Sequence, residues 1–366
     1  MAVAAAVMAT AALALAPGAP PRAAGRRPAV LVTSPSATTS TVPAPAVRWA
    51  GAVEHLFFHP LVIRPELAFT RDRLAQGFRN FFLTAGEFRA VLAQLDRNGW
   101  TLVDIHRAVA GEVRVPPGRR PFVLSVDDVN YYDYSRTRGL GWRLVLDPAG
   151  DVKVESRDDR GVRLTDDDIV PIIDEFVSRH PQFSADGAKG VLAVTAYQGL
   201  LGERLDDRRS QDRAGSVERA TAMARRLQAT GWVFADHSYG HIDFARAPLA
   251  VARRDIERWQ RVAEPIVGPT DLFVYPFGAA PPPSSPLVAM LRDHGYTVIC
   301  DIDVVPRFIR AQGVVIMSRR HIDGLALRQE ARPLAPFFDV ASVEDRAARS
   351  AGLPRAASAG RVDRRP

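Results

Sequence analysis

The stretch "ATGWVFADH" at residues 229–237 decides the fold, because the chain contains two counterparts of it. "RNGWTLVDI" at 97–105 and "DHGYTVICD" at 293–301 share its order: a helix end, a glycine, an aromatic residue and a β-like run. Glycine is favoured after a helix because it adopts a left-handed backbone without strain. Helix–strand joins that repeat along a chain are typical of a parallel sheet or barrel.

Further apolar runs predict more strands of the same sheet. The helix before the first join is supported by Thr84 and Glu87, which resemble a capping box. Together with the three joins, these runs give about seven or eight strands, which favours an α/β fold: a distorted (β/α) barrel of about seven strands. The runs are residues 55–59, 122–126, 191–195, 272–276 and 314–318.

The alternation of helix and strand breaks between residues 131 and 190. "WRLVLDPAGDVKVE" at 142–155 predicts a hairpin that turns at 148–150. "TDDDIVPIIDEFVSRH" at 165–180 predicts a helix begun by Thr165. We therefore expect an inserted hairpin-plus-helix segment that forms one wall of a site.

The charge of the chain is concentrated in its two ends. The formal net charge is +7, and 47% of the residues are hydrophobic, enough for a sizeable core. Residues 1–48 hold four arginines and no acid, and residues 341–366 hold six arginines and three acids, so residues 49–340 are neutral. The high pI is therefore poor evidence for nucleic-acid binding, and no nucleic-acid partner is expected. The single cysteine, Cys300, excludes an internal disulfide and a cysteine-rich zinc site.

The composition predicts three parts of the chain. Residues 1–48 combine an apolar run ending in an A-x-A-like site with a linker rich in Pro, Ala, Ser and Thr. They predict export to the cell envelope or beyond, or a cytoplasmic protein if the start codon is misassigned, and the run is too short for a convincing membrane span. Residues 49–340 form the folded domain, and residues 341–366 are expected to be a disordered basic tail. The oligomeric state is left open.

Two acids and two histidines follow predicted strands. Asp127 and Asp128 come directly after an apolar run, where adjacent buried carboxylates need a cation or a chemical role. His237 and His241 are four residues apart, a spacing that lets both bind one metal on a turn. All four follow the carboxyl end of a strand, which carries the active site in (β/α) barrels. His55 and His59 share the spacing, but four residues of strand span about 13 Å, so we expect core packing or a rim role.

Three motifs resemble those of the polysaccharide deacetylases, carbohydrate esterase family 4, also known as the NodB-homology domain. They are "SVDDV" at 125–129, "HSYGH" at 237–241 and "VYPFG" at 274–278, in the family's order and about 110 and 40 residues apart. "LFFHPLV" at 56–62 is similar to the opening strand of many members, so the resemblance covers about residues 50–330. It implies a metal-dependent N-deacetylase of the Y-P-x-G subgroup.

The resemblance also implies a role for each matching residue. Asp127 would be the general base, and Asp128, His237 and His241 would hold a divalent metal, with zinc as first candidate and cobalt as alternative. The backbone N–H of Phe277 would donate to the oxyanion. The late histidine that acts as general acid has one candidate, His321, and a surface role beside Arg319 and Arg320 is an alternative.

The sequence departs from the family at two further positions. Val129 replaces the usual Gly after the acidic pair, and Val274 replaces the Arg that orients the base in many members. The expected substrate is an N-acetylated glycan of a cell wall or matrix, with Tyr131, Tyr132 and Tyr197 as candidate sugar-stacking groups. A deacylase of a smaller amide and an inactive glycan-binding barrel are the alternatives.

Overall fold

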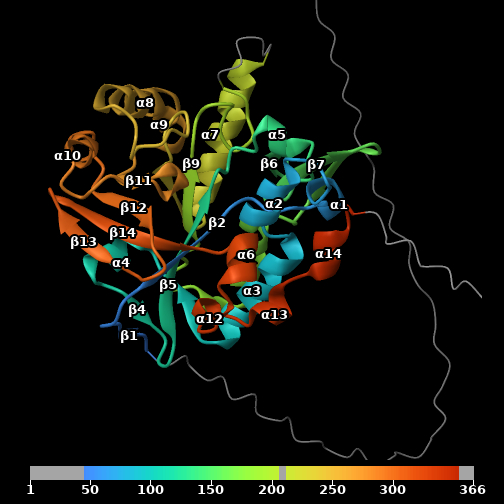
Figure 1. Cartoon of the computed structure of the whole chain (residues 1–366), viewed down its shortest axis with the longest axis horizontal. Coiled ribbons are helices and arrows are strands. Elements are labelled where there is room, and N and C mark those ends of the chain that lie inside the picture. The colour runs from blue at the N-terminus through green and yellow to red at the C-terminus, as the bar shows by residue number, and fades with distance from the viewer. Residues whose placement is uncertain (1–44, 206–211, 354–366) are drawn as a thin grey trace, which may run out of the picture. The chain divides into compact units, whose positions relative to one another are not determined.

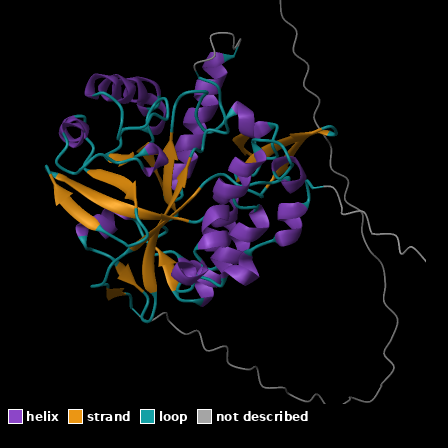
Figure 2. Ribbon diagram, in the orientation of Figure 1, coloured by secondary structure: helices purple, strands orange, loops and turns teal. Residues whose placement is uncertain are grey.

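The computed structural model describes residues 45–205 and 212–353. Within these residues, seven strands form a closed ring in the order β12, β11, β10, β9, β5, β2, β14 and back to β12, and every pairing in the ring is parallel. Figures 1 and 2 show helices on the outside of these strands. The predicted seven-stranded (β/α) barrel is confirmed. Its strands are β2 Glu54–Phe58, β5 Arg120–Asp127, β9 Gly190–Val194, β10 Trp232–Asp236, β11 Leu272–Val274, β12 Val298–Ile302 and β14 Val314–His321.

The three repeated joins are confirmed as helix–glycine–strand units. Helices α3 (Ala85–Arg97), α7 (Arg213–Ala229) and α10 (Pro286–Asp293) precede them. Gly99, Gly231 and Gly295 have φ of 76°, 101° and 98°, the left-handed region that glycine enters without strain. The predicted capping box of α3 is also present. The first join differs in one respect, because its strand β3 (Trp100–Leu102) pairs with the start of β5 outside the ring.

The barrel strands are buried on both faces, as parallel strands covered by helices are. Apolar side chains fill the interior of the ring, among them Val123, Ala193, Ala235 and Met317. Cys300 packs there too, and burial raises the pKa of its thiol to about 12, so it stays protonated. The shorter helices are α1 Pro65–Ala68, α2 Ala75–Phe81, α4 Ile105–Ala110, α5 Asp133–Arg136, α9 Glu264–Val267, α11 Gly324–Gln329, α12 Ala331–Leu334 and α13 Val340–Val343.

The insertion contains the predicted hairpin and helix. Strands β6 (Arg143–Leu146) and β7 (Val152–Asp158) are antiparallel, and β8 (Gly161–Thr165) adds a third strand that the sequence did not predict. The helix α6 spans Ile169–Arg179. Its predicted start at Thr165 is wrong: Asp168 caps the helix by accepting a hydrogen bond from the N–H of Ile169 at 2.7 Å, while Thr165 ends β8.

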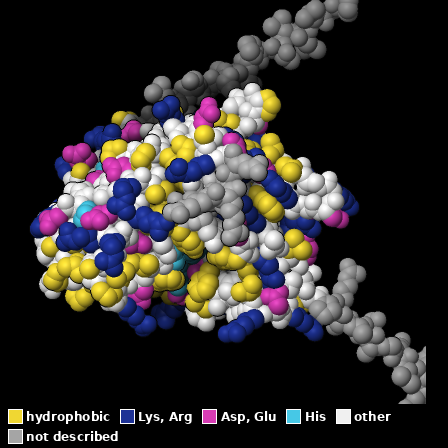
Figure 3. All heavy atoms as spheres, turned by 90° about the horizontal axis from the view of Figure 1, so that it is seen from above, with side chains coloured by type: hydrophobic (Ala, Val, Ile, Leu, Met, Phe, Trp, Pro, Cys, Tyr) yellow, Lys and Arg dark blue, Asp and Glu magenta, His cyan; other side chains and the backbone are white. Residues whose placement is uncertain are grey.

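The folded domain extends beyond the predicted limits of residues 49 and 340. Strand β1 (Val47–Arg48) pairs with β4 (Arg114–Val115), and α14 (Arg346–Ser350) is held by an ion pair of 2.7 Å between Arg349 and Glu87. The expected signal run and the end of the expected tail lie outside the described residues. Among the described residues, no helix is both long and apolar enough to cross a membrane. Basic and acidic side chains are interspersed on the face seen in Figure 3.

Candidate active site

The predicted site residues meet at the carboxyl end of the barrel. Asp127 is the last residue of β5 and Asp128 follows it, His237 follows β10, and His321 ends β14. Phe277 lies in the short 3-10 turn η2 (Pro276–Gly278) after β11. This end of a (β/α) barrel is where loops gather side chains from several strands.

The backbone of the site is held in conformations that side chains other than glycine seldom adopt. Asp128, Ser238, His241 and Phe277 have φ of 62°, 67°, 52° and 59°. Such conformations cost free energy and persist where the surrounding structure enforces them, often at functional sites. The site therefore depends on contacts that hold its loops.

Asp128, His237 and His241 form a group that could hold a metal ion. One ligand atom from each lies within 4.8 Å of the others. His241 Nε2 is 3.7 Å and His237 Nε2 is 4.0 Å from Asp128 Oδ1. His237 Nδ1 lies 2.8 Å from the carbonyl oxygen of Val274, which can only accept, so Nδ1 carries the proton and Nε2 keeps its lone pair for a metal. Two imidazoles and a carboxylate fit a catalytic zinc site, which leaves a position open for water.

Helix α8 (Leu249–Val262) braces the loop between the two histidines. The Asp255 carboxylate accepts hydrogen bonds from Ser238 Oγ at 2.7 Å, Tyr239 N–H at 2.7 Å and Gly240 N–H at 2.9 Å. Three bonds to consecutive residues fix the course of this loop, which contains two left-handed residues. The positions of both histidine side chains therefore depend on a carboxylate that does not itself belong to the triad.

A tyrosine holds the third ligand of the triad. The Tyr132 hydroxyl donates to Asp128 Oδ1 at 2.7 Å and lies 2.8 Å from Thr195 Oγ1. Tyr132 is 4% exposed and Tyr131 is 2% exposed, so neither ring is available to a sugar, and the expectation that they stack on one is wrong. Tyr132 instead positions a ligand, because a hydrogen bond to a carboxylate oxygen restricts its rotation.

Asp127 is paired with an arginine for which no role at the site was predicted. Arg319 on β14 is fully buried and donates to both oxygens of Asp127, from Nη1 at 2.6 Å and from Nη2 at 3.0 Å. Burial raises the pKa of Asp127, but the charges of Arg319 and His237 and the Arg319 hydrogen bonds outweigh it and lower the pKa to about 2. Arg319 thus contacts Asp127 from β14, whereas the position of the usual motif arginine is held by Val274.

Arg319 is itself fixed by the barrel interior. Its Nη1 donates to Ser125 Oγ at 3.1 Å, and its guanidinium lies 4.3 Å from the ring centroid of Phe57. Ser125 Oγ also lies 3.0 Å from Nε2 of His55, which is 1% exposed. The core role predicted for His55 is confirmed, and its burial and the nearby Arg319 hold its pKa well below the usual range.

A cavity of about 330 Å³ opens over these groups and exposes two histidines beyond the triad. His321 is held between carboxylates, with Nε2 2.8 Å from Glu330 and Nδ1 3.9 Å from Asp323. His59 lines the same cavity, and its buried Nδ1 has no hydrogen-bond partner among the described residues. The rim role was one of two expected for His59, and the structure places His59 one residue beyond the end of β2 rather than inside the strand as predicted.

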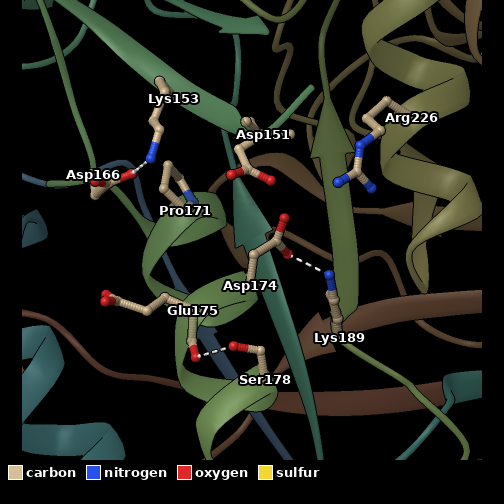
Figure 4. Close-up of a pocket in the computed structure, with 10 residues that line it drawn as sticks. Asp151, Lys153, Asp166, Pro171, Asp174, Glu175, Ser178, Lys189 and Arg226 are labelled. Carbon is tan, nitrogen blue, oxygen red and sulfur yellow. Dashed lines mark hydrogen bonds and ion pairs between the residues drawn. The ribbon is translucent and has the colours of Figure 1, made fainter. Parts of the chain in front are cut away.

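A second cavity, of about 460 Å³, lies between the insertion and α7 but differs in chemistry. Figure 4 shows that both lysines of this cavity pair with carboxylates: Lys153 contacts Asp166 at 2.7 Å and Lys189 contacts Asp174 at 2.6 Å. Arg226 donates to the carbonyl of Gly150 at 2.9 Å. Satisfied pairs of this kind stabilise a surface groove, so the smaller cavity over Asp127 is the candidate active site.

Comparison with known proteins supports the assignment of the motifs. Residues 210–299 match the family model described as "Polysaccharide deacetylase". The matched segment contains both "HSYGH" and "VYPFG", and "SVDDV" precedes it. The resemblance to the polysaccharide deacetylases is thereby confirmed. No curated protein matches the chain.

Several solved structures are similar to this chain at low identity. The deacetylase PplD of Streptococcus pyogenes is 13% identical with a TM-score of 0.46, and covers 81% of this chain and 99% of its own. A de-N-acetylase from Aggregatibacter actinomycetemcomitans is 14% identical with a TM-score of 0.47, covering 79% and 100%. A polysaccharide deacetylase from Bacillus cereus is 14% identical with a TM-score of 0.44, covering 80% and 69%. At these identities and TM-scores, the similarity does not define the function of this chain.

Proposed function

We propose that this protein removes N-acetyl groups from an N-acetylated glycan by metal-dependent hydrolysis. Its three motifs resemble those of the polysaccharide deacetylases, and residues 210–299 match that family. One observation carries the proposal. A carboxylate, Asp127, lies beside three side chains that can share a metal, with His237 Nε2 only 3.9 Å from Asp127 Oδ2. A base next to a metal-ligand group is what amide hydrolysis requires.

The two acids divide the work between them. Asp128, with His237 and His241, would hold a divalent cation, for which zinc is the first candidate, and when bound it supplies Lewis-acid activation of water and of the acetamide carbonyl. Asp127 takes a proton from the attacking water, whose oxygen bonds to the carbonyl carbon. The Phe277 N–H is assigned to donate to the developing oxyanion.

The reaction is completed when the carbon–nitrogen bond breaks and the amine leaves with a proton. His321 is the donor suggested by the motif order, and its contacts with Glu330 and Asp323 would orient its imidazole. His59 is the competing donor, because its unpartnered Nδ1 lies in the same cavity. The variants His321→Gln and His59→Gln distinguish the two candidates. Replacement of the true proton donor should abolish the basic limb of the pH–rate profile, and replacement of the other histidine should not.

Acetate release tests the proposed function directly. The purified full chain, loaded with zinc or cobalt, is assayed on N-acetylglucosamine oligomers and on peptidoglycan beside Asp127→Asn and His237→Ala. His180→Ala serves as matched control, because His180 is a half-exposed histidine that pairs with Asp96 away from the cavity. We expect metal-dependent release that both site variants abolish and the control retains. A folded, metal-binding chain that releases no acetate from any of these glycans contradicts the proposal.

A further inference from the structure

Tyr131 lies three residues after Asp128, and its backbone is held in an uncommon conformation with φ of 53°. Its carbonyl oxygen accepts hydrogen bonds from Arg136 Nε and from Arg204 Nη2, both at 2.9 Å. Its hydroxyl donates to Asp168 Oδ2 at 2.7 Å. A left-handed residue other than glycine persists where its surroundings enforce it, so these three bonds maintain a conformation that the chain would otherwise leave.

The ring of Tyr131 packs closely against the inserted sheet. A Cβ atom added to Gly141, just before β6, would lie 2.9 Å from Tyr131 Cε1 and would also meet the side chain of Val154 on β7, so a larger residue does not fit there. Tyr131 is not among the residues that line the active-site cavity. The insertion therefore encloses this ring and holds it away from the substrate side of the site.

Asp168, which begins helix α6 of the insertion, connects two loops at the active-site end of the barrel. Besides capping its own helix, its Oδ1 accepts a hydrogen bond from the N–H of Leu61 at 2.9 Å. Its Oδ2 accepts the hydroxyl of Tyr131. Leu61 follows His59 by two residues and Tyr131 follows Asp128 by three, so one carboxylate joins the loop after β2 to the loop after β5.

The Asp168 carboxylate lies where its charge is disfavoured. It is 1% exposed, and none of the lysines and arginines that the structure describes forms an ion pair with it. Burial raises its pKa to about 6, although the hydrogen bonds from Leu61, Tyr131 and Ile169 lower it. A buried acid without a counter-ion is costly, and it is tolerated when hydrogen bonds satisfy it. The bonds that do so here link three segments of the chain.

We propose that Asp168 and Tyr131 are positioning residues through which the insertion fixes the third metal ligand: with Tyr131 held, the next residue, Tyr132, presents its hydroxyl to Asp128. This inference rests on the proposed function, since it concerns the metal ligands of the same site. Neither Asp168 nor Tyr131 lines the cavity, so their effect has to reach it through Tyr132. The insertion thus helps to hold the metal site, a role separate from the wall that it was expected to form.

Zinc affinity tests both residues without any need for turnover. The metal-free full chain is titrated with zinc in competition with a chromophoric chelator, as wild type, Tyr131→Phe, Asp168→Ala and Asp168→Asn. Tyr131→Phe deletes one hydrogen bond and should raise the zinc dissociation constant about fivefold, and Asp168→Ala, which deletes several, about tenfold or more. Asp168→Asn should stay within about twofold of the wild type, since its amide oxygen can still accept from Leu61 and its NH2 group can donate to Tyr131.

Thr101→Val is the matched control. Thr101 is a buried residue of β3, beside the start of β5, and its hydroxyl donates to the carbonyl of Gln182 at 3.1 Å. Its replacement should lower the thermal unfolding midpoint as Tyr131→Phe does and leave zinc affinity unchanged. An unchanged affinity in Tyr131→Phe, or an equal weakening in Thr101→Val, would overturn the inference. A loss in Asp168→Asn as large as that in Asp168→Ala would also overturn it, because the hydrogen bonds would then not be what matters.

A double variant tests the route through Tyr132. If Tyr131 acts by placing Tyr132, then Tyr131→Phe/Tyr132→Phe should weaken zinc binding about fivefold, as each single variant does, and not by the product of the two effects, about 25-fold. A loss as large as the product would show that Tyr131 acts on the site by another route, which contradicts the inference.

Acetate release by the same proteins separates this inference from the proposed function. Zinc binding that follows the expected pattern, without acetate release by the zinc-loaded chain, would contradict the proposed function and keep the inference. Acetate release by a chain whose zinc affinity is indifferent to Tyr131→Phe would do the reverse.

Discussion

The candidate active site has a base side around Asp127 and a metal side around Asp128. These two residues are adjacent in the sequence, but the two sides are held in opposite ways. On the base side, Asp127 and Arg319 are buried on barrel strands and joined by two hydrogen bonds. On the metal side, Asp128, His237 and His241 lie on loops with ligand atoms up to 4.8 Å apart. The proposed base is therefore held by the barrel itself, whereas the proposed metal ligands are held by hydrogen bonds from residues around the loops.

Breaking the base side should have the largest effect. Arg319→Met leaves Asp127 buried without its partner, which should lower the free energy of unfolding by about 3–5 kcal/mol and abolish activity. The double variant Asp127→Asn/Arg319→Met removes both charges, so it should recover most of that stability without recovering activity. Urea denaturation of the wild type, both single variants and the double variant measures the coupling. A double variant as unstable as the sum of the singles would show that the pair is not coupled.

Loosening the metal side should affect metal affinity more than stability. Asp255→Asn removes one of two carboxylate oxygens that hold the loop at residues 238–240, so the zinc dissociation constant should rise about tenfold. Isothermal titration calorimetry of the metal-free chain measures it. Asp243→Asn is the matched control, since Asp243 lies just beyond His241 and pairs with exposed Arg246 at 3.6 Å. An unchanged zinc affinity in Asp255→Asn would mean that the loop holds its shape without the brace.

A smaller change is expected from the hydroxyl that orients the third ligand. Tyr132→Phe deletes the hydrogen bond to Asp128 and keeps the ring in its stack with Tyr134 and Tyr197. Loss of one such bond should weaken zinc binding by about 1 kcal/mol, or roughly fivefold. Competition with a chromophoric chelator is sensitive enough to detect it. The thermal unfolding midpoint should change little, because the packing of the ring is retained, and a large drop would assign Tyr132 to the core instead.

The sequence predicted the barrel and the members of the site for a physical reason. Strand ends of a parallel barrel converge, so motifs that follow separate strands must meet, whatever the loops between them do. Asp127, Asp128, His237 and His241 are close together for this reason.

The pairing of Arg319 with Asp127 was not predicted, because charged residues usually lie at the surface. The signal for its burial was present: "VVIMSRRH" is an apolar strand, and Met317 and Arg319 are two residues apart, so both face the barrel interior. The brace from Asp255 could not be found this way. Asp255 joins α8 to the loop at residues 238–240, and no sequence pattern in either segment predicts that the two are in contact.

The base side should also make the stability of the fold depend on pH. The pKa of Asp127 is about 2 in the folded chain against 3.8 ordinarily, so the pair stabilises the fold above pH 3.8 and loses that contribution as the pH falls toward 2. The double variant Asp127→Asn/Arg319→Met has no carboxylate there to protonate. Unfolding free energies of the two proteins, measured between pH 5 and pH 2, should therefore converge as the medium is acidified. A constant difference over that range would show that the charge of Asp127 contributes nothing to folding, and that the bidentate pair serves orientation alone.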